Sequence, residues 1–200
     1  DSFGRRVHTN VTNIARGLRA RLVVGGEAME EVDVANSQPL FLALLLRQHG
    51  VLTPDALEYT RLVESGGLYE LLMADRGVGP SLRGRFKRAV ISRVLYCKNK
   101  DNDNELALAF GQRFPSVLGL IRSVKRDDYT ELARLLQRAE SDLVIGGVCA
   151  RLMREHPAVP ILSVHDSLLT TPANMPTVVR LMNEEFGAAG LSPALRRKAG

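Results

Sequence analysis

Two acidic residues fall where predicted strands end, and the first lies in residues 160–170. There an aliphatic run, residues 161–164, is followed by His165 and Asp166 and then by another apolar pair. A short run of this kind, entered through proline, predicts a buried strand that turns at Asp166 and returns as a second strand. Desolvating an unpaired carboxylate is costly, so we expect a cation or a basic side chain beside it. A hairpin tip whose polar groups only satisfy the backbone explains the same residues.

The second acid, Asp33, ends an alternating run, residues 29–34, that predicts a strand. Residues 36–39 break this strand. Pro39 then opens an apolar run, residues 40–46, that predicts a buried helix with proline in its first turn. A carboxylate at the end of a strand, beside the N-terminus of a helix, is a frequent place for a metal or phosphate site.

The positive charge of the chain is concentrated in one segment. Residues 76–100 contain eight Lys or Arg and no Asp or Glu, and the rest of the chain carries 19 basic and 22 acidic residues. Such a segment is typical of a surface that binds the phosphates of nucleic acids or nucleotides. A solvated basic helix face is the alternative.

Composition limits the class of protein. With 200 residues, 45% of them hydrophobic, the chain is long enough for one core, or for a core with a small lobe. The longest apolar run, residues 39–46, is too short to cross a bilayer, and no signal peptide is recognisable. The two cysteines form no CxxC or Cys/His pattern, which argues against disulfides and structural zinc. We expect a cytoplasmic protein without a membrane partner.

The remaining segments are mostly helical in pattern. A Thr-Pro-Asp cap and a Gly-Gly stop bound a helix from residue 53 to about 64, and the basic segment holds a helix that places Arg83 and Lys87 four apart on one face. Residues 196–198 read as a basic tail. Further helices are expected at residues 68–74, 82–96, 105–114, 117–125, 128–153 and 177–186.

Together, five segments in this order resemble the palm and fingers of family A nucleic acid polymerases, which include DNA polymerases and phage-type single-subunit RNA polymerases. Residues 4–9, Gly-Arg-Arg-Val-His-Thr, resemble the segment ahead of motif A that touches nucleic acid, which implies this role for Arg5, Arg6 and His8. Residues 32–38 resemble motif A, whose leading acid, here Asp33, holds the catalytic metals.

The basic helix resembles motif B, whose Arg and Lys bind the triphosphate, here Arg83 and Lys87. The family places a Tyr eight residues after the Lys, whereas Tyr96 is nine after Lys87 and eight after Arg88. Either a helical bulge intervenes or Arg88 takes the role of the lysine. The resemblance implies that Tyr96 stacks under the new base, although Cys97 stands where the family has glycine.

The last two segments complete the resemblance. Gln137-x4-Asp142 is similar to the Q-x4-D of the family's IQGTAAD segment, and His165-Asp166-Ser167 is similar to motif C. Gln137 and His165 are thereby expected to touch nucleic acid and Asp166 to hold metal. Ser167, with a Thr and a Pro shortly after it, is nearer the RNA polymerase branch.

The resemblance implies a function and an architecture. Asp33 and Asp166 would hold two Mg²⁺ ions, for which Mn²⁺ can substitute, and the enzyme would add nucleoside triphosphates to the 3′-hydroxyl of a primer on a template. The fold would be α+β: a small antiparallel sheet carrying the acids, packed by helices, with a reduced helical fingers part. Residues 1–200 would form one palm/fingers core, with the fingers-like part at roughly residues 53–127.

Some departures from the family matter for function. Gln38, five residues beyond Asp33, fills the place where DNA-polymerising members carry a bulky Glu, so we expect a preference for deoxynucleotides. None of these residues resembles the family's thumb or exonuclease, and we expect further domains or accessory proteins to replace the thumb.

Three other readings remain open at the level of sequence. One is a catalytically weak nucleic-acid-binding protein on the same scaffold, and another is an enzyme like a single-subunit RNA polymerase. The third is an unrelated metal-dependent phosphohydrolase that uses Asp33, Asp166 and His165. The phosphohydrolase explains neither the Arg83-x3-Lys87 spacing nor the order of the segments.

Overall fold

The computed structural model describes residues 1–19 and 21–198. The chain divides into two compact units. Unit 1 comprises Asp1–Gln38 and Gln137–Gly200, and unit 2 comprises Pro39–Leu136. The predicted fingers-like part, residues 53–127, falls inside unit 2, and its assignment as a fingers subdomain stays a prediction.

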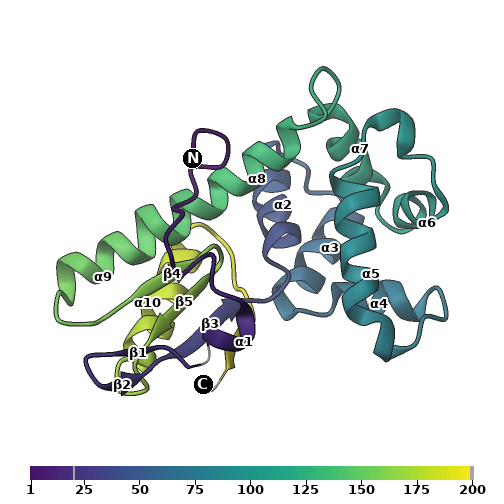
Figure 1. The fold of residues 1–200 in the computed structure, drawn as a ribbon. Helices are drawn as coiled ribbons and strands as arrows, with labels where there is room; N and C mark the ends of the chain where they lie inside the picture. Colours follow the sequence, from purple (N-terminus) through teal and green to yellow (C-terminus); the bar gives the residue numbers. More distant parts are fainter. Residues whose placement is uncertain (20, 199–200) are drawn as a thin grey trace. The chain divides into compact units, whose positions relative to one another are not determined.

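Unit 1 is built on a four-stranded antiparallel sheet with the strand order β4-β5-β3-β6 (Figure 1). A separate two-stranded hairpin joins β1 (Val23–Val24) to β2 (Glu27–Ala28). Gly25 and Gly26 form its turn, both at positive φ, which glycine adopts without strain. The strands of the main sheet are β3 (Glu30–Val34), β4 (Leu162–Val164), β5 (Ser167–Thr170) and β6 (Leu195–Lys198).

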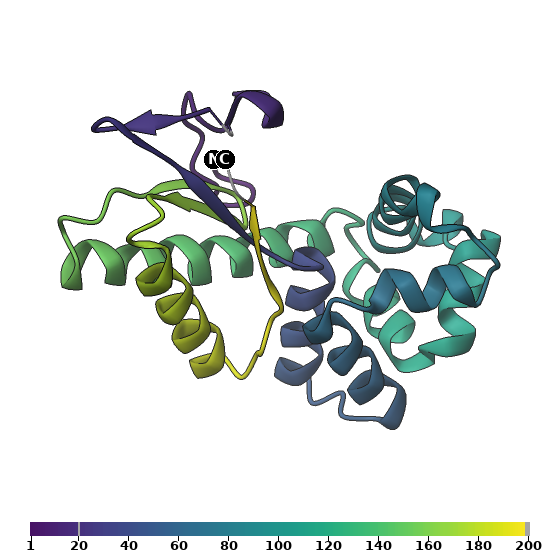
Figure 2. The same cartoon turned by 90° about the horizontal axis from the view of Figure 1, so that it is seen from below.

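The strand register separates the two faces of this sheet. Val32 pairs with Leu168, and both are fully buried on the face that α10 (Met175–Ala188) covers (Figure 2). Because side chains alternate along a strand, Asp33 and its partner Ser167 lie on the other face. The predicted strand pattern of residues 29–34 is therefore confirmed, and Asp33 lies on the face of the sheet opposite α10.

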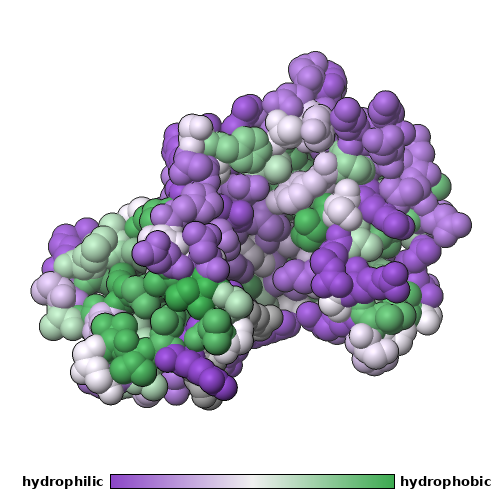
Figure 3. Space-filling view, viewed as in Figure 1, coloured by the Kyte–Doolittle hydropathy of each residue, from purple (hydrophilic) through white to green (hydrophobic). Residues whose placement is uncertain are grey.

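Besides the sheet and α10, unit 1 contains most of a long helix and the N-terminal segment of the chain. A long helix begins as α8 (Glu131–Ser141), whose residues up to Leu136 belong to unit 2, passes through a π-helical segment, η4 (Asp142–Cys149), and ends as α9 (Ala150–Glu155). One short helix, α1 (Arg16–Arg19), lies in the N-terminal segment. Figure 3 shows apolar side chains gathered over the β1–β2 hairpin and the strands beside it, where Val23 is 58% exposed.

Unit 2 is helical throughout its described elements. Its core includes an aromatic group in which the Tyr59 ring stands edge-on to Phe110 and Phe114, with centroids 6.1 and 5.5 Å away. Its elements, the first of which begins in unit 1, are α2 (Ser37–Gln48), α3 (Pro54–Ser65), α4 (Leu68–Ala74), η1 (Pro80–Leu82), α5 (Arg83–Val90), η2 (Ile91–Leu95), η3 (Asn99–Asp101), α6 (Glu105–Arg113) and α7 (Pro115–Val124).

The predicted helices all occur, and local signals explain their ends. Thr53 precedes α3, and Gly66 ends it in the left-handed conformation, with φ 81°. The α+β class, with its small sheet and its helical second part, is confirmed. No helix in the described part of the chain is long and apolar enough to cross a membrane.

One prediction is wrong: residues 196–198 are not a basic tail but belong to strand β6, which pairs with β3. The sequence Leu-Arg-Arg-Lys has no apolar alternation because β6 is an edge strand held partly by charge. Arg197 pairs with Glu30 at 3.1 Å, and Lys198 pairs with Glu31 at 2.8 Å. Basic side chains are common on edge strands because they discourage pairing with other chains.

Candidate active site

The two predicted acids lie at the same end of two paired strands. Strands β4 and β5 form the predicted hairpin, with His165 and Asp166 as its turn and His165 at φ 55°. Asp33 is the register partner of Ser167, which directly follows Asp166 in the chain. The register therefore brings both acids to one end of the sheet, the edge that runs across the strand ends and not along the outer strand β6.

Asp33 has two carboxylate oxygens in different surroundings. Oδ2 accepts a hydrogen bond from Lys198 Nζ at 2.6 Å. Oδ1 is buried and has no hydrogen-bond partner in the described part of the chain. Buried polar atoms are nearly always satisfied, so an unpartnered carboxylate oxygen points to a missing donor or cation.

The donor set fits Mg²⁺ bound together with a substrate. No group of three or more His, Cys, Asp or Glu side chains that could hold a metal occurs among the described residues. Mg²⁺ does not need one, because it is usually held by one or two carboxylates, with water and substrate phosphates completing its octahedron. Asp33, through Oδ1, and Asp166 are the residues that would hold it.

Two residues that sequence reasoning missed, Glu31 and Lys198, complete this edge. The Glu31 carboxylate accepts from Lys198 Nζ at 2.8 Å and from the Ser167 hydroxyl at 3.0 Å. Burial alone would raise the pKa of Glu31, but the hydrogen bond and charge of Lys198, with the Ser167 hydroxyl, outweigh it and lower the pKa. Strand alternation could have placed Glu31 on the same face as Asp33, whereas no local sequence pattern predicts that Lys198 contacts these acids.

Two other predicted segments meet in unit 1. The backbone of Gly4 passes so close to Gln137 that a Cβ at Gly4 would lie 2.6 Å from the Gln137 Oε1 atom. Ser141 Oγ donates to the Arg5 carbonyl at 2.6 Å, and the exposed Arg5 side chain pairs with Asp142 at 3.1 Å. Residues 4–9 and 137–142 thus form one structure, although Arg5 and Ser141 are 136 positions apart.

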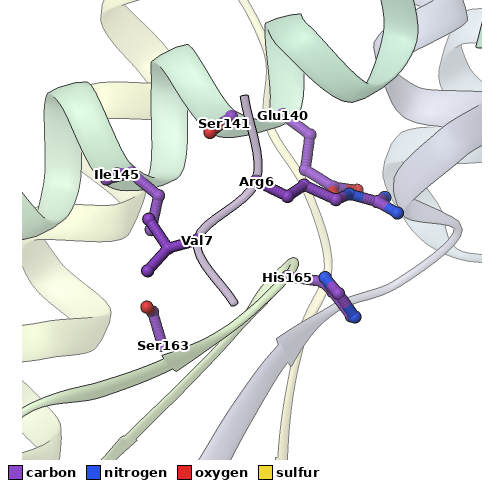
Figure 4. A pocket seen from close by; sticks show the side chains of 7 residues that line it. All are labelled: Arg6, Val7, Glu140, Ser141, Ile145, Ser163 and His165. Carbon is purple, nitrogen blue, oxygen red and sulfur yellow. The ribbon is translucent and has the colours of Figure 1, made fainter. Parts of the chain in front are cut away.

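Glu140 is the buried centre of this structure (Figure 4). Its side chain is 3% exposed, and its Oε1 accepts from Arg6 Nη2 at 2.6 Å. Its Oε2 accepts from Ser37 Oγ at 2.9 Å and from Gln38 Nε2 at 2.6 Å. Because a carboxylate only accepts, the amide NH₂ of Gln38 must face Glu140 and its carbonyl oxygen must point away.

His165 lines a small pocket next to this ion pair. The pocket is also lined by Arg6, Glu140 and Ser163, and the His8 and His165 ring centroids are 6.4 Å apart. Burial, together with the positive charge of Arg6, lowers the pKa of His165 and so favours the neutral ring. Its Nδ1 is buried without a hydrogen-bond partner in the described chain.

In unit 2, helix α5 sorts its cations onto different faces. Arg83 Cζ and Lys87 Nζ both lie over the ring of Tyr69, at 5.7 and 5.9 Å from its centroid. Arg83 also pairs with Glu70 at 2.5 Å. Arg88 instead lines a separate groove with Arg85 and Arg93. The structure therefore groups Lys87, and not Arg88, with Arg83.

The helical bulge, one of the two alternatives for Tyr96, is present. Residues Ile91–Leu95 form a π-helix, and Tyr96 N donates to the Ile91 carbonyl at 3.0 Å, an i to i+5 bond. One π-turn takes up one extra residue, so Tyr96 can follow Lys87 by nine positions and keep the face expected for eight. The buried Lys125 ammonium donates to the carbonyls of Val94 and Cys97 at 3.3 and 3.0 Å and secures the end of this segment.

Comparison with solved structures gives a neighbour in fold. The chain is similar to the POL domain of Pol1 from M. smegmatis, solved in complex with DNA primer-template and dNTP, with a TM-score of 0.64. Sequence identity is 19%, and the alignment covers 94% of this chain but 43% of that one, so this chain spans less than half its length. Comparison with family models gives no match, and neither does comparison with curated proteins. The predicted resemblance to a family A polymerase is confirmed at the level of the fold.

The Glu140 ion pair yields a stability prediction. Arg6→Ala should lower the free energy of unfolding by about 3–5 kcal/mol, because it leaves a buried carboxylate without its cation. Arg5→Ala is the matched control: its pair with Asp142 is exposed, and its loss should cost at most about 1 kcal/mol. Urea unfolding followed by circular dichroism measures both.

Adding Glu140→Gln to Arg6→Ala should recover part of the loss, because the unpaired buried charge is then removed. Equal losses for Arg5→Ala and Arg6→Ala would contradict the central role of Glu140.

Proposed function

We propose that this chain carries out template-directed nucleotide transfer, as a DNA polymerase of the family A type that extends a 3′-hydroxyl. The observation that carries the proposal is Asp33, whose buried Oδ1 has no partner among the described residues and lies at the end of the sheet that also carries Asp166. The same edge lies in a polymerase-like fold. Primer extension with labelled dNTPs and NTPs, in Mg²⁺ or Mn²⁺, tests it directly.

In this proposal Asp33 and Asp166 hold two divalent ions. Bound there, the ions would activate the attacking 3′-hydroxyl and stabilise the leaving pyrophosphate. Arg83 and Lys87 neutralise the triphosphate, for which the planar guanidinium of Arg83 suits bidentate contact. Tyr96 stacks under the new base, and Gln38 faces the sugar.

Contacts with primer and template are proposed for residues 4–9 and for their partners in unit 1. Arg5 and His8 have the open side chains, 58% and 53% exposed, that backbone phosphates require. Gln137 and His165 are also proposed to contact the nucleic acid. Arg6 is 22% exposed and holds Glu140, so its main contribution is to position this segment.

A second candidate is a nucleic-acid-binding protein that keeps the palm scaffold with little or no catalysis. One observation favours it: the ammonium of Lys198 lies 2.6 Å from the carboxylate that would have to hold metal. Binding of primer-template without extension in either metal would support this candidate over the first. Extension that uses NTPs alone would support the RNA polymerase-like alternative.

The first activity prediction concerns the metal ligands. Asp33→Asn and Asp166→Asn should each reduce nucleotide incorporation by roughly a thousandfold, because metal stabilisation of the transition state is worth several kcal/mol. Glu155→Gln is a control that removes an acid from an exposed ion pair with Arg151. Circular dichroism verifies folding, and substantial activity in either Asn variant would contradict the assignment.

The second prediction separates Lys87 from Arg88. Lys87→Ala should lower kcat/KM for the nucleotide by about 10- to 100-fold, the scale of a lost charge-assisted hydrogen bond, with little change in primer-template affinity. Arg88→Ala, on the other face of α5, is the matched control and should leave kcat/KM for the nucleotide nearly unchanged. A severe Arg88→Ala defect with a mild Lys87→Ala defect would reverse the assignment.

The third prediction concerns the sugar. Gln38→Ala should raise use of an NTP relative to the matching dNTP by about tenfold or more, because the substitution removes the bulky side chain that is proposed to face the sugar. Ser37→Ala is the control, since Ser37 also donates to Glu140 but is not assigned to the sugar. The measurement is the ratio of kcat/KM values, and an unchanged ratio in Gln38→Ala places the sugar check elsewhere.

A further inference from the structure

The chain supplies its own cation to the carboxylates at the end of β3. Lys198 Nζ lies 2.6 Å from Asp33 Oδ2 and 2.8 Å from Glu31 Oε1. The three side chains are 29%, 23% and 13% exposed, so water screens this group only in part. Charge-assisted bonds of this length are the strong ones among protein hydrogen bonds.

The strand register explains why Lys198, and not its neighbour, takes this place. In the pairing of β3 with β6, Lys198 lies opposite Glu31, and Arg197 lies opposite Val32. Side chains alternate, so Lys198 shares the face of the acids, whereas Arg197 points to the other face and pairs with Glu30 at 3.1 Å. Of the three cations of β6, Arg197 therefore lies on one face of the sheet, and Lys198 and Arg196, the register partner of Asp33, lie on the other.

The position of Lys198 affects any metal that binds Asp33. The Oδ1 atom of Asp33 is buried and has no partner in residues 1–19 and 21–198, and its Oδ2 atom accepts from Lys198. A divalent ion bound to Asp33 would be repelled by the Lys198 ammonium, which lies 2.6 Å from the Oδ2 atom of the same carboxylate. The Glu31 carboxylate, which also accepts a hydrogen bond from the Ser167 hydroxyl, is a second acceptor at which Lys198 can remain after it leaves Asp33.

We propose that Lys198 is a resident cation of this site, which neutralises Asp33 in the metal-free protein and, when a divalent ion binds Asp33, leaves Asp33 and stays paired with Glu31. This proposal rests on the proposed role of Asp33 as a metal ligand. It implies that the affinity for metal is set by competition with a lysine from β6. Metal binding is thereby coupled to the outer strand of the sheet.

The test is a Mn²⁺ titration of the full chain, in which free Mn²⁺ is measured by electron paramagnetic resonance. Lys198→Gln removes the charge but keeps hydrogen-bond donors for both carboxylates, and it should bind Mn²⁺ roughly tenfold more tightly than the wild type. Lys198→Arg keeps the charge and should stay close to the wild type. Arg197→Gln, the matched loss of charge on the opposite face, should change affinity by less than about twofold.

Thermal unfolding gives a second readout that does not depend on activity. In EDTA, Lys198→Gln should unfold at a lower temperature than the wild type, because Glu31 and Asp33 then repel each other without a cation. Saturating Mn²⁺ should raise its unfolding temperature more than that of the wild type. Lys198→Met, which keeps the length of the side chain, should behave in the same way.

The outcomes separate this proposal from the proposed function. If Asp33→Asn weakens Mn²⁺ binding but neither neutral variant of Lys198 tightens it, the competition is overturned and the metal ligand stands. If Asp33→Asn leaves Mn²⁺ binding unchanged, the assignment of Asp33 fails, and this proposal fails with it. An equal gain in affinity for Arg197→Gln would mean that only general charge is at work, which also overturns the specific role of Lys198.

Discussion

A carboxylate removed from water must meet a positive charge or a set of donors, and unit 1 depends on this constraint. The carboxylates of Glu31, Asp33 and Glu140 are largely buried there. Each is matched by a cation from a distant part of the chain: Lys198 serves the first two and Arg6 the third. The fold closes its strand β6 and its N-terminal segment onto the rest of unit 1 partly through these pairs, because leaving one buried charge unpaired is strongly destabilising.

Local patterns were enough to predict most of the elements. The 160–170 hairpin follows from a short apolar run, β3 from the alternation of residues 29–34, and α3 from its cap and its glycine stop. The basic strand β6 escaped because an edge strand stabilised by ion pairs has no apolar alternation. The boundaries between the two units, after Gln38 and after Leu136, were not predicted either, because helices α2 and α8 continue across them without a break in the sequence pattern.

The candidate site was predictable where its residues carry short-range spacing. Counting from Lys87 to Tyr96 left two alternatives, and the π-helix at Ile91–Leu95 is the first of them. The partners of the predicted residues were not predictable. Glu140 lies 102 positions from Gln38, and Lys198 lies 165 positions from Asp33, so only the folded chain brings them together.

The buried carboxylates of unit 1 differ in how completely they are satisfied, and this difference separates support from function. Glu140 has both oxygens filled, by Arg6 on one side and by Ser37 and Gln38 on the other. A carboxylate in this state has little capacity left for a ligand, and its work is to fix the side chains around it. Asp33 has one oxygen held by a single movable ammonium and the other held by nothing among the described residues. Because a native fold rarely leaves a buried acceptor unfilled, this incomplete satisfaction is the reason for proposing Asp33, rather than the more deeply buried Glu140, as the acid that binds a ligand.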